Sequence, residues 1–176
     1  MVSAAKKYAA LYLVFLCSSL FFLGLYSFNN KYVQDTIQAS NGILILSEQD
    51  IQKSPIRFLA SGWAFYPDIL LTPEELQAST YYMHYLSIGE QDNFFSPANP
   101  SPYGCGTYRM TFFLPESKEA YALEIPEVFS AYNLYLDNKL ILQMGDPTHG
   151  TPMLQNRMVT FYGGEPVTLT IAVSNY

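Results

Sequence analysis

Cysteine and histidine are scarce, with two of each in 176 residues. Cys17 lies in a long apolar run near the N-terminus and Cys105 lies far beyond it, so the region after that run cannot form an internal disulfide. His84 and His149 stand 65 positions apart, without a carboxylate or cysteine at a spacing typical of metal ligands. We therefore expect a domain stabilised by its apolar core, with no metal and no cofactor.

Charged residues are also few. They make up 14% of the chain, whereas aromatic residues make up 16%, with fifteen Tyr and twelve Phe. This composition opposes disorder and favours a packed sheet protein rich in aromatic side chains. Beyond Lys7 the chain has seven basic and fifteen acidic residues. Because nucleic-acid binding requires an excess of positive charge, we expect no nucleic-acid partner.

No charge at all occurs from Tyr8 to Phe28, a run of twenty-one residues. About 20 apolar residues are enough for a helix to cross a bilayer. Lys6 and Lys7 precede the run, and the first acidic residue is Asp35, so the positive-inside rule places the N-terminus in the cytoplasm. Residues 1–28 are predicted to be a signal anchor, with residues 8–28 as a single-pass transmembrane helix and the rest of the chain extracytoplasmic.

Two other export signals remain as alternatives. A cleaved signal peptide also has a basic start and an apolar core, although its core is usually about 7 to 15 residues long. The apolar run here is longer, and no small-x-small cleavage site follows it. A lipoprotein signal would use Cys17, but the bulky Leu16 stands where that signal needs a small residue.

After residue 28 the chain is predicted to form a juxtamembrane spacer with a first strand at 29–55 and one domain at 56–176. The composition and turn signals predict strands at 43–46, 56–67 (bent at Gly62 and closed by Pro67), 81–88, 107–114, 120–125 and 167–175, and a hairpin at 130–145 with Asp137 and Asn138 at its turn. The polar stretch 47–55 is predicted to be a turn, 72–76 a helix start and 89–106 a long surface loop. Since the last strand stands at the very end, we expect the domain to be truncated there.

Alternation within these strands predicts two kinds of face. The strand 107–114 places Tyr108, Met110, Phe112 and Leu114 on one face and Thr107, Arg109, Thr111 and Phe113 on the other. Roughly seven short strands with turn signals and almost no helix favour two facing sheets. The predicted fold is an all-β, antiparallel jelly-roll β-sandwich preceded by one transmembrane helix.

Three stretches carry a resemblance to known families: "GWAFYPDILLTPEEL", "GTYRMTFFLP" and "ALEIPEVFSAYNLYLDNKLILQMG". Together they resemble the jelly-roll sensor domain on the outer face of bacterial seven-transmembrane receptors with diverse intracellular signalling modules, and of related membrane histidine kinases. The same pattern is similar to the galactose-binding-like domain that accompanies many glycosidases. The resemblance covers residues 56–176, and it implies the fold more firmly than the function.

The resemblance implies binding and not catalysis, so we expect no enzyme activity. As a sensor input module, the protein would take part in signal transduction, without an output domain in this chain. The expected partners are the membrane, through residues 8–28, and a small-molecule or carbohydrate ligand, or a neighbouring envelope protein. The alternatives are an accessory carbohydrate-binding module of a surface glycosidase and a degenerate structural fragment.

Five residues are candidates for a ligand site. Trp63 and Tyr66 have the aromatic rings of a sugar-stacking platform, although aromatic residues at alternating positions also fill a sandwich core. Arg109 can pair with a ligand carboxylate or hydroxyls, or instead with a residue of the domain such as Glu124. Asn133 and Tyr135 share the polar face of their hairpin strand, and together with Arg109 they would line one sheet surface.

Overall fold

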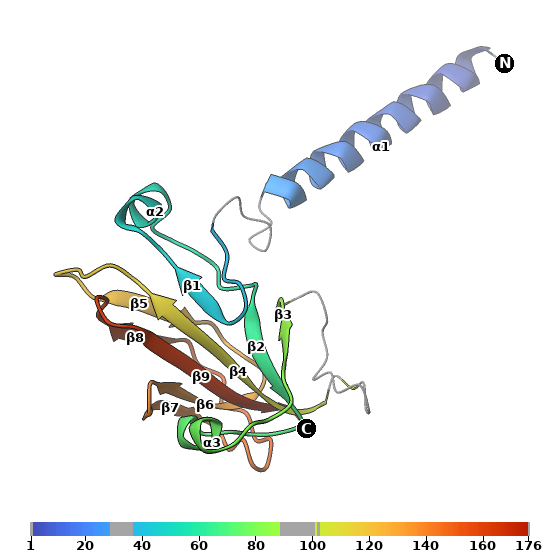
Figure 1. Cartoon of the computed structure of the whole chain (residues 1–176). Helices are drawn as coiled ribbons and strands as arrows, with labels where there is room; N and C mark the ends of the chain where they lie inside the picture. Colours follow the sequence, from blue (N-terminus) through green and yellow to red (C-terminus); the bar gives the residue numbers. More distant parts are fainter. Residues whose placement is uncertain (1, 29–36, 89–100, 102, 176) are drawn as a thin grey trace. The chain divides into compact units, whose positions relative to one another are not determined.

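The computed structural model describes residues 2–28, 37–88, 101 and 103–175, and the chain divides between Asp35 and Thr36 into two compact units. The first unit contains α1 (Val2–Phe28), drawn in blue in Figure 1. The predicted helix is therefore confirmed. Its Lys6–Phe28 part is long and apolar enough to cross a membrane, a property that signal anchors and signal peptides share.

The second unit holds nine strands and two short helices within the described residues (Figure 1). They are β1 (Ile43–Ile45), α2 (Glu48–Lys53), β2 (Trp63–Pro67), α3 (Pro73–Ala78), β3 (His84–Leu86), β4 (Gly104–Phe113), β5 (Tyr121–Ile125), β6 (Ala131–Leu136), β7 (Lys139–Met144), β8 (Arg157–Phe161) and β9 (Val167–Asn175).

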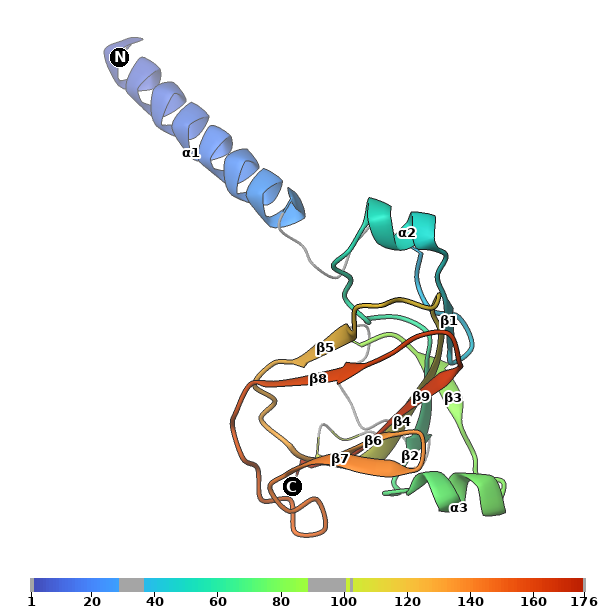
Figure 2. The same ribbon diagram turned by 90° about the vertical axis from the view of Figure 1, so that its left-hand side faces the viewer.

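The strands form two sheets. The larger sheet has the order β3-β2-β4-β9-β6-β7. β1 also belongs to it: β2 pairs with the first half of β4, and β1 pairs with the second half of β4 along the same edge. β5 and β8 form a separate two-stranded sheet, which Figure 2 shows apart from β4, β9 and β6. The predicted antiparallel all-β architecture is confirmed for every strand pair except β1–β4, which is parallel. The jelly-roll connectivity itself is not confirmed.

The core lies between the two sheets. We call the side of the larger sheet that faces β5 and β8 its inner face and the opposite side its outer face. Met110, Phe112, Leu134 and Leu169 project from the inner face and pack with the small sheet's Ile125 and Val159, all at most 8% exposed. Burial of these chains against one another is the main force that holds the sheets together. The predicted alternation of β4 is confirmed, since its apolar positions are the ones that face this core.

The aromatic residues near β2 belong to the same core. The rings of Trp63 and Tyr108 meet edge to face with centroids 6.0 Å apart, and Phe65 lies 4.6 Å from Tyr108 between ring centroids. Burial raises the pKa of Tyr108 to about 12, because the apolar surroundings disfavour the charged phenolate. The Tyr108 side chain therefore acts as a neutral core residue.

Two short helices begin with capping boxes. Thr72 caps α3 as predicted, with Pro73 at its first position, and the Glu75 carboxylate accepts a hydrogen bond from the Thr72 backbone N–H. The prediction of a turn at 47–55 is wrong, because Ser47 and Asp50 form the same reciprocal motif and start α2. Ser47 and Asp50 fit the capping-box pattern, since Asp at the third position replaces the more common Glu.

Turn geometry agrees with two predictions. Gly62 has a φ of 76° immediately before β2, which confirms a bend there, but the strand predicted at 56–67 is wrong over 56–62, since β2 begins only at Trp63. Asp137 has a φ of 53°, and it forms with Asn138 the two-residue loop between β6 and β7. The Asp137 carboxylate accepts a hydrogen bond of 2.8 Å from the Thr168 backbone N–H, which ties the hairpin to β9.

Some predicted boundaries are wrong. Gly104 to Gly106 belong to β4 instead of the predicted loop 89–106, since they pair with the end of β9; residues 89–100 and 102 lie outside the described part. The strand predicted at 81–88 is limited to His84–Leu86. Strand β8 was not predicted at all. Residues 29–36, in the predicted spacer, also lie outside the described residues.

The loop after β7 is held together by a carboxylate. Asp146 accepts hydrogen bonds from the Thr148 hydroxyl and from the Thr148 N–H at 3.0 Å, and its other oxygen lies 2.7 Å from His149 Nδ1. These hydrogen bonds, the one from the Thr148 side chain first, lower the pKa of Asp146 to about 2. The Ser174 hydroxyl donates to the Pro147 carbonyl, so the loop is also fixed to β9.

We expect this loop to lose stability in acid. The pKa of Asp146 is lowered in the folded protein, so its stabilising effect is fully present above the ordinary value of 3.8 and disappears as the pH falls through about 2. Carboxyl titration by NMR is expected to show this low pKa, and Thr148→Ala is expected to raise it toward 3.8. Thr160→Ala, an exposed threonine of β8, is the matched control and is expected to leave the titration unchanged. An Asp146 pKa near 3.8 in the unmodified chain would contradict this account.

Candidate functional site

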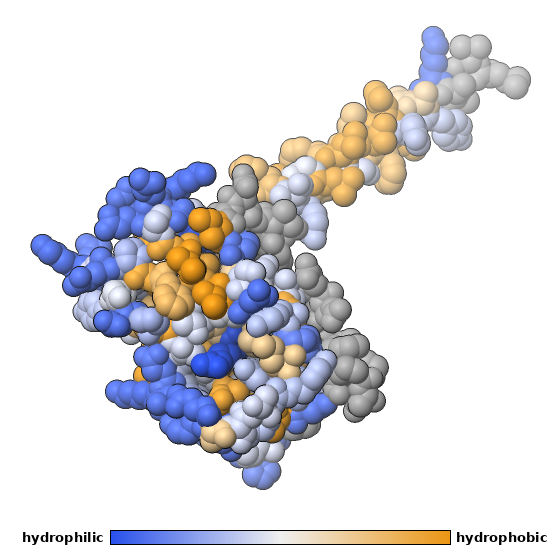
Figure 3. All heavy atoms as spheres, in the orientation of Figure 1, coloured by the Kyte–Doolittle hydropathy of each residue, from blue (hydrophilic) through white to orange (hydrophobic). Residues whose placement is uncertain are grey.

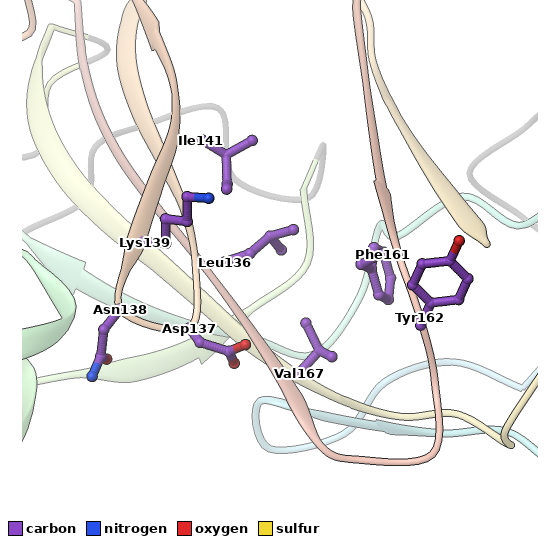
Figure 4. Close-up of a pocket in the computed structure, with 8 residues that line it drawn as sticks. All are labelled: Leu136, Asp137, Asn138, Lys139, Ile141, Phe161, Tyr162 and Val167. Atoms are coloured by element: carbon purple, nitrogen blue, oxygen red, sulfur yellow. The ribbon is translucent and has the colours of Figure 1, made fainter.

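A cleft of about 530 Å³ opens between the two sheets beside the β6–β7 turn (Figure 4). Its size falls in the range of roughly 300 to 1,000 Å³ that is usual for small-ligand sites. The residues around it come from the β6–β7 hairpin, the end of β8 and the start of β9. They are Leu136, Asp137, Asn138, Lys139, Ile141, Phe161, Tyr162 and Val167.

A β-bulge shapes the hairpin wall. Leu134 pairs with Leu142 and Tyr135 with Leu140, so Ile141 is an extra residue on β7. Because the bulge breaks the strict alternation, Ile141 and Leu142 both contact the core. In Figure 4, Lys139 and Ile141 project from the hairpin on the side of the cleft, whereas Asn138 points away from it.

The opposite wall is aromatic. Phe161 stacks on Phe112 with centroids 5.8 Å apart and planes at 19°, and it also lies 6.1 Å from the Tyr121 ring centroid. These contacts fix the Phe161 ring at the floor of the cleft. Tyr162 follows it and is 65% exposed, so its ring and hydroxyl are available at the mouth. One rigid ring and one exposed ring therefore line the same wall.

Polar groups gather at the mouth. The Asp137 carboxylate already accepts the Thr168 N–H, which satisfies one of its oxygens. Lys139 is exposed and has no ion-pair partner among the described residues. Within the same described part, no group of His, Cys, Asp and Glu side chains is arranged to hold a metal ion. The cleft thus combines an apolar floor, an exposed aromatic ring and a few hydrogen-bonding groups, which is the usual chemistry of a site for a small organic ligand.

The five residues predicted for the site lie elsewhere. Strand register places Arg109, Thr170 and Tyr135 side by side on the outer face, with Tyr66 and Asn133 in the next row of that face. The hypothesis that Arg109, Asn133 and Tyr135 line one sheet surface depends on a register that the sequence does not fix, and the observed register places the three on one face. Their binding of a ligand stays a prediction.

Trp63 is not part of that face. It lies on the inner face with 3% of its surface exposed, and its Nε1–H donates to the Leu59 carbonyl at 2.7 Å. Tyr66 is on the outer face but only 8% exposed, packed with Leu71. Trp63 and Tyr66 therefore form no exposed stacking platform. Trp63 fills the core between the sheets, as the core interpretation expects, whereas Tyr66 is buried on the outer face with Leu71.

A covering segment explains the burial of the outer face. The residues from Asp68 to Ala78 pass over it, and the buried Thr107 hydroxyl holds them there, accepting from the Leu71 N–H at 2.8 Å and donating to the Ile69 carbonyl at 2.9 Å. The Gln77 side chain donates to Asn138 at 3.1 Å, which joins α3 to the β6–β7 turn.

Arg109 has no charged partner among the residues that the structure describes. It is half-buried, and it has no hydrogen bond or ion pair within the described residues. The predicted pairing with Glu124 does not form: Glu124 is exposed on β5, in the other sheet. Beside Arg109, the Thr170 hydroxyl is buried and also lacks a hydrogen-bond partner.

The cleft itself was not predicted. A strand signal does exist in "RMVTF", because Val159 and Phe161 alternate with Met158 and Thr160 and the turn residues Gly163 and Gly164 follow, but the segment is only five residues long and the apolar Met158 weakens the alternation. The bulge on β7 leaves no clear mark in the sequence. Without β8 and the bulge, the aromatic and hairpin walls of the cleft cannot be brought together.

Comparisons with known proteins show only distant structural similarity. No protein-family model matches the chain, and no curated protein matches its sequence. The β-glucuronidase of Faecalibacterium prausnitzii is similar in structure with a TM-score of 0.47 and 17% identity, over 64% of this chain and 20% of the enzyme. The Ruminococcus gnavus β-glucuronidase gives a TM-score of 0.44 and 16% identity, again over 64% and 20%. The similarity thus spans about a fifth of each enzyme's length, and we draw no functional conclusion from it.

Proposed function

We propose that this protein is a ligand-binding β-sandwich module, held at the outer side of a membrane by α1, whose cleft binds a carbohydrate or a similar small polar ring. The observation that carries the proposal is the composition of the cleft. Apolar side chains line its floor, Tyr162 offers an exposed ring, and Lys139 and Asp137 lie at its mouth. Sugars combine an apolar ring face with hydroxyl groups, so they match such a surface.

Within this proposal the module binds and does not catalyse. The accessory carbohydrate-binding role requires nothing beyond the cleft. The sensor-input role is supported by α1, an apolar helix through which binding outside a membrane would be coupled to the inside. That role further requires that the ligand bind two arrangements of the protein with different affinity. A neighbouring envelope protein is the other proposed occupant of the cleft.

A glycan-binding experiment tests the proposal. The full chain in lipid nanodiscs is exposed to an array of oligosaccharides, and the affinity of any binder is measured by titration. Tyr162→Ala is expected to weaken binding about tenfold, since an aromatic contact contributes roughly 0.5 to 1.5 kcal/mol. Tyr82→Ala is the matched control, because Tyr82 is 64% exposed against 65% for Tyr162 but does not line the cleft. Absence of binding to every glycan, or equal losses for the two variants, would reject the carbohydrate proposal.

A further inference from the structure

The outer face of the larger sheet is covered over one part and bare over another. The covering segment from Asp68 to Ala78 lies over the end that contains Thr107. At the other end, Ile43 pairs with Thr111 and Ile45 with Phe113, so these side chains share the outer face. Ile43 is 42% exposed, Ile45 65% and Phe113 41%. We call Ile43, Ile45 and Phe113 the β1 patch; Figure 3 shows apolar atoms gathered over the region of β1.

The β1 patch is unusual for a solvent-facing surface. Leu44 and Leu46 alternate with Ile43 and Ile45, and the two leucines fill the core at 4% and 8% exposure. A strand that is apolar on both sides is typical of one covered on both sides. Clustered exposed apolar side chains mark interaction surfaces, whereas scattered ones need no explanation. The β1 patch therefore indicates a surface that another apolar body covers.

Arg109 gives the patch a second chemical feature. Arg109 lies two residues before Thr111 on β4, so both side chains are on the outer face. Because Thr111 pairs with Ile43, Arg109 is close to the β1 patch. Its guanidinium is half-buried and has no partner in the described part of the chain. Arginine binds phosphate through paired hydrogen bonds and is weakly hydrated, so it suits a partly buried contact with an anion. Apolar side chains beside an unpaired arginine match the acyl and phosphate layers of a phospholipid surface.

The position of the patch in the chain favours the same occupant. Ile43 follows the end of α1 at Phe28 by fifteen residues, which span at most about 50 Å when fully extended. If α1 crosses the bilayer, the β1 patch therefore stays within about 50 Å of the bilayer surface. Such tethering makes even a weak contact effective, since the second contact becomes intramolecular.

We propose that the β1 patch docks on the lipid bilayer, with Ile43, Ile45 and Phe113 at the level of the upper acyl chains and Arg109 on a lipid phosphate. The proposal rests on the anchoring part of the proposed function and does not involve the cleft. Docking would limit how the sandwich reorients above the membrane.

Depth-dependent fluorescence quenching tests the docking. The full chain, with Cys17 and Cys105 replaced by serine, is reconstituted into vesicles of phosphatidylcholine and phosphatidylglycerol. An environment-sensitive label is attached through Ile45→Cys, or through Thr160→Cys on the exposed side of β8 as the control. Spin-labelled lipid headgroups are expected to quench the label at position 45 and aqueous iodide to reach it poorly, with the reverse at position 160. Arg109→Gln is expected to reduce the lipid quenching at position 45 roughly twofold, because a phosphate contact is lost.

The other outcomes are distinct. Equal iodide quenching at positions 45 and 160, in protein that floats with the vesicles and keeps its circular dichroism, would overturn the docking and leave the anchor intact. Protection from iodide without lipid quenching would show a protein cover and would also overturn it. Failure to float would reject the anchor and the docking together. Binding of glycans in the cleft is measured separately, so its failure would not affect this result.

Discussion

Replacement of Gly62 by alanine is expected to lower the free energy of unfolding by about 3 kcal/mol or more. Two costs add at this position. Gly62 has a φ of 76°, a left-handed conformation that costs other residues roughly 1 to 2 kcal/mol. A Cβ there would also lie 2.2 Å from the Ala39 carbonyl oxygen and 2.8 Å from the Ser40 nitrogen. Both contacts are with backbone, so they cannot be relieved by a side-chain rotation, and the segment before β1 must move.

A second glycine separates these two costs. Gly164 has a φ of 98°, but a Cβ at Gly164 would come no closer than 3.4 Å to its nearest neighbour, the Cβ of Glu116, which is an ordinary contact distance. Gly164→Ala is therefore expected to cost about 1 to 2 kcal/mol, from the backbone conformation alone. Urea unfolding of the full chain in detergent, followed by the fluorescence of its single tryptophan, Trp63, measures both variants. Equal losses for the two variants would show that close packing at Gly62 has no effect.

Leu134→Ala is expected to cost about 2 to 5 kcal/mol, the range for removing a buried leucine side chain. Leu134 is fully buried on β6 at the centre of the core, where β9 and β7 flank it. Neighbouring strands cannot collapse into the space that its loss would leave, because hydrogen bonds hold them on both sides. The same urea experiment measures the loss.

Leu140→Ala provides the comparison for Leu134→Ala. Leu140 belongs to the same hairpin but is 46% exposed, so its truncation is expected to cost less than about 1 kcal/mol. The ratio of the two losses in free energy of unfolding shows how much more the inward-facing side chain of the hairpin contributes to stability than the exposed one. If Leu140→Ala were as harmful as Leu134→Ala, the hairpin's inner and outer faces would have to be reassigned.

Patterns that act within one strand or turn were predicted well. The alternation of β4 follows from a two-residue period, and the turn at Asp137 follows from residues that tolerate a positive φ. The capping residue Thr72 is a local signal as well. In each case the information lies within about ten residues of sequence, which is why no knowledge of the rest of the fold was needed.

Features that depend on pairing between distant strands were not predictable. A two-residue period shows that Trp63 and Tyr66 lie on opposite faces of β2. It does not show which of these faces points to the core, or that the segment from Asp68 to Ala78 covers the opposite face. The register that places Arg109 beside Thr170 joins residues 61 positions apart. The cleft depends on the end of β8 lying across from a bulged β7, and these two strands belong to different sheets.

The central place of β9 determines when this domain can fold during its synthesis. β9 lies between β4 and β6, and these two strands are joined only through it. Until Val167–Asn175 has left the ribosome, the preceding strands form two incomplete halves, each with an open edge ready to pair with another chain. The larger sheet therefore cannot be completed before Val167–Asn175 is available, and until then both open edges are exposed to aggregation.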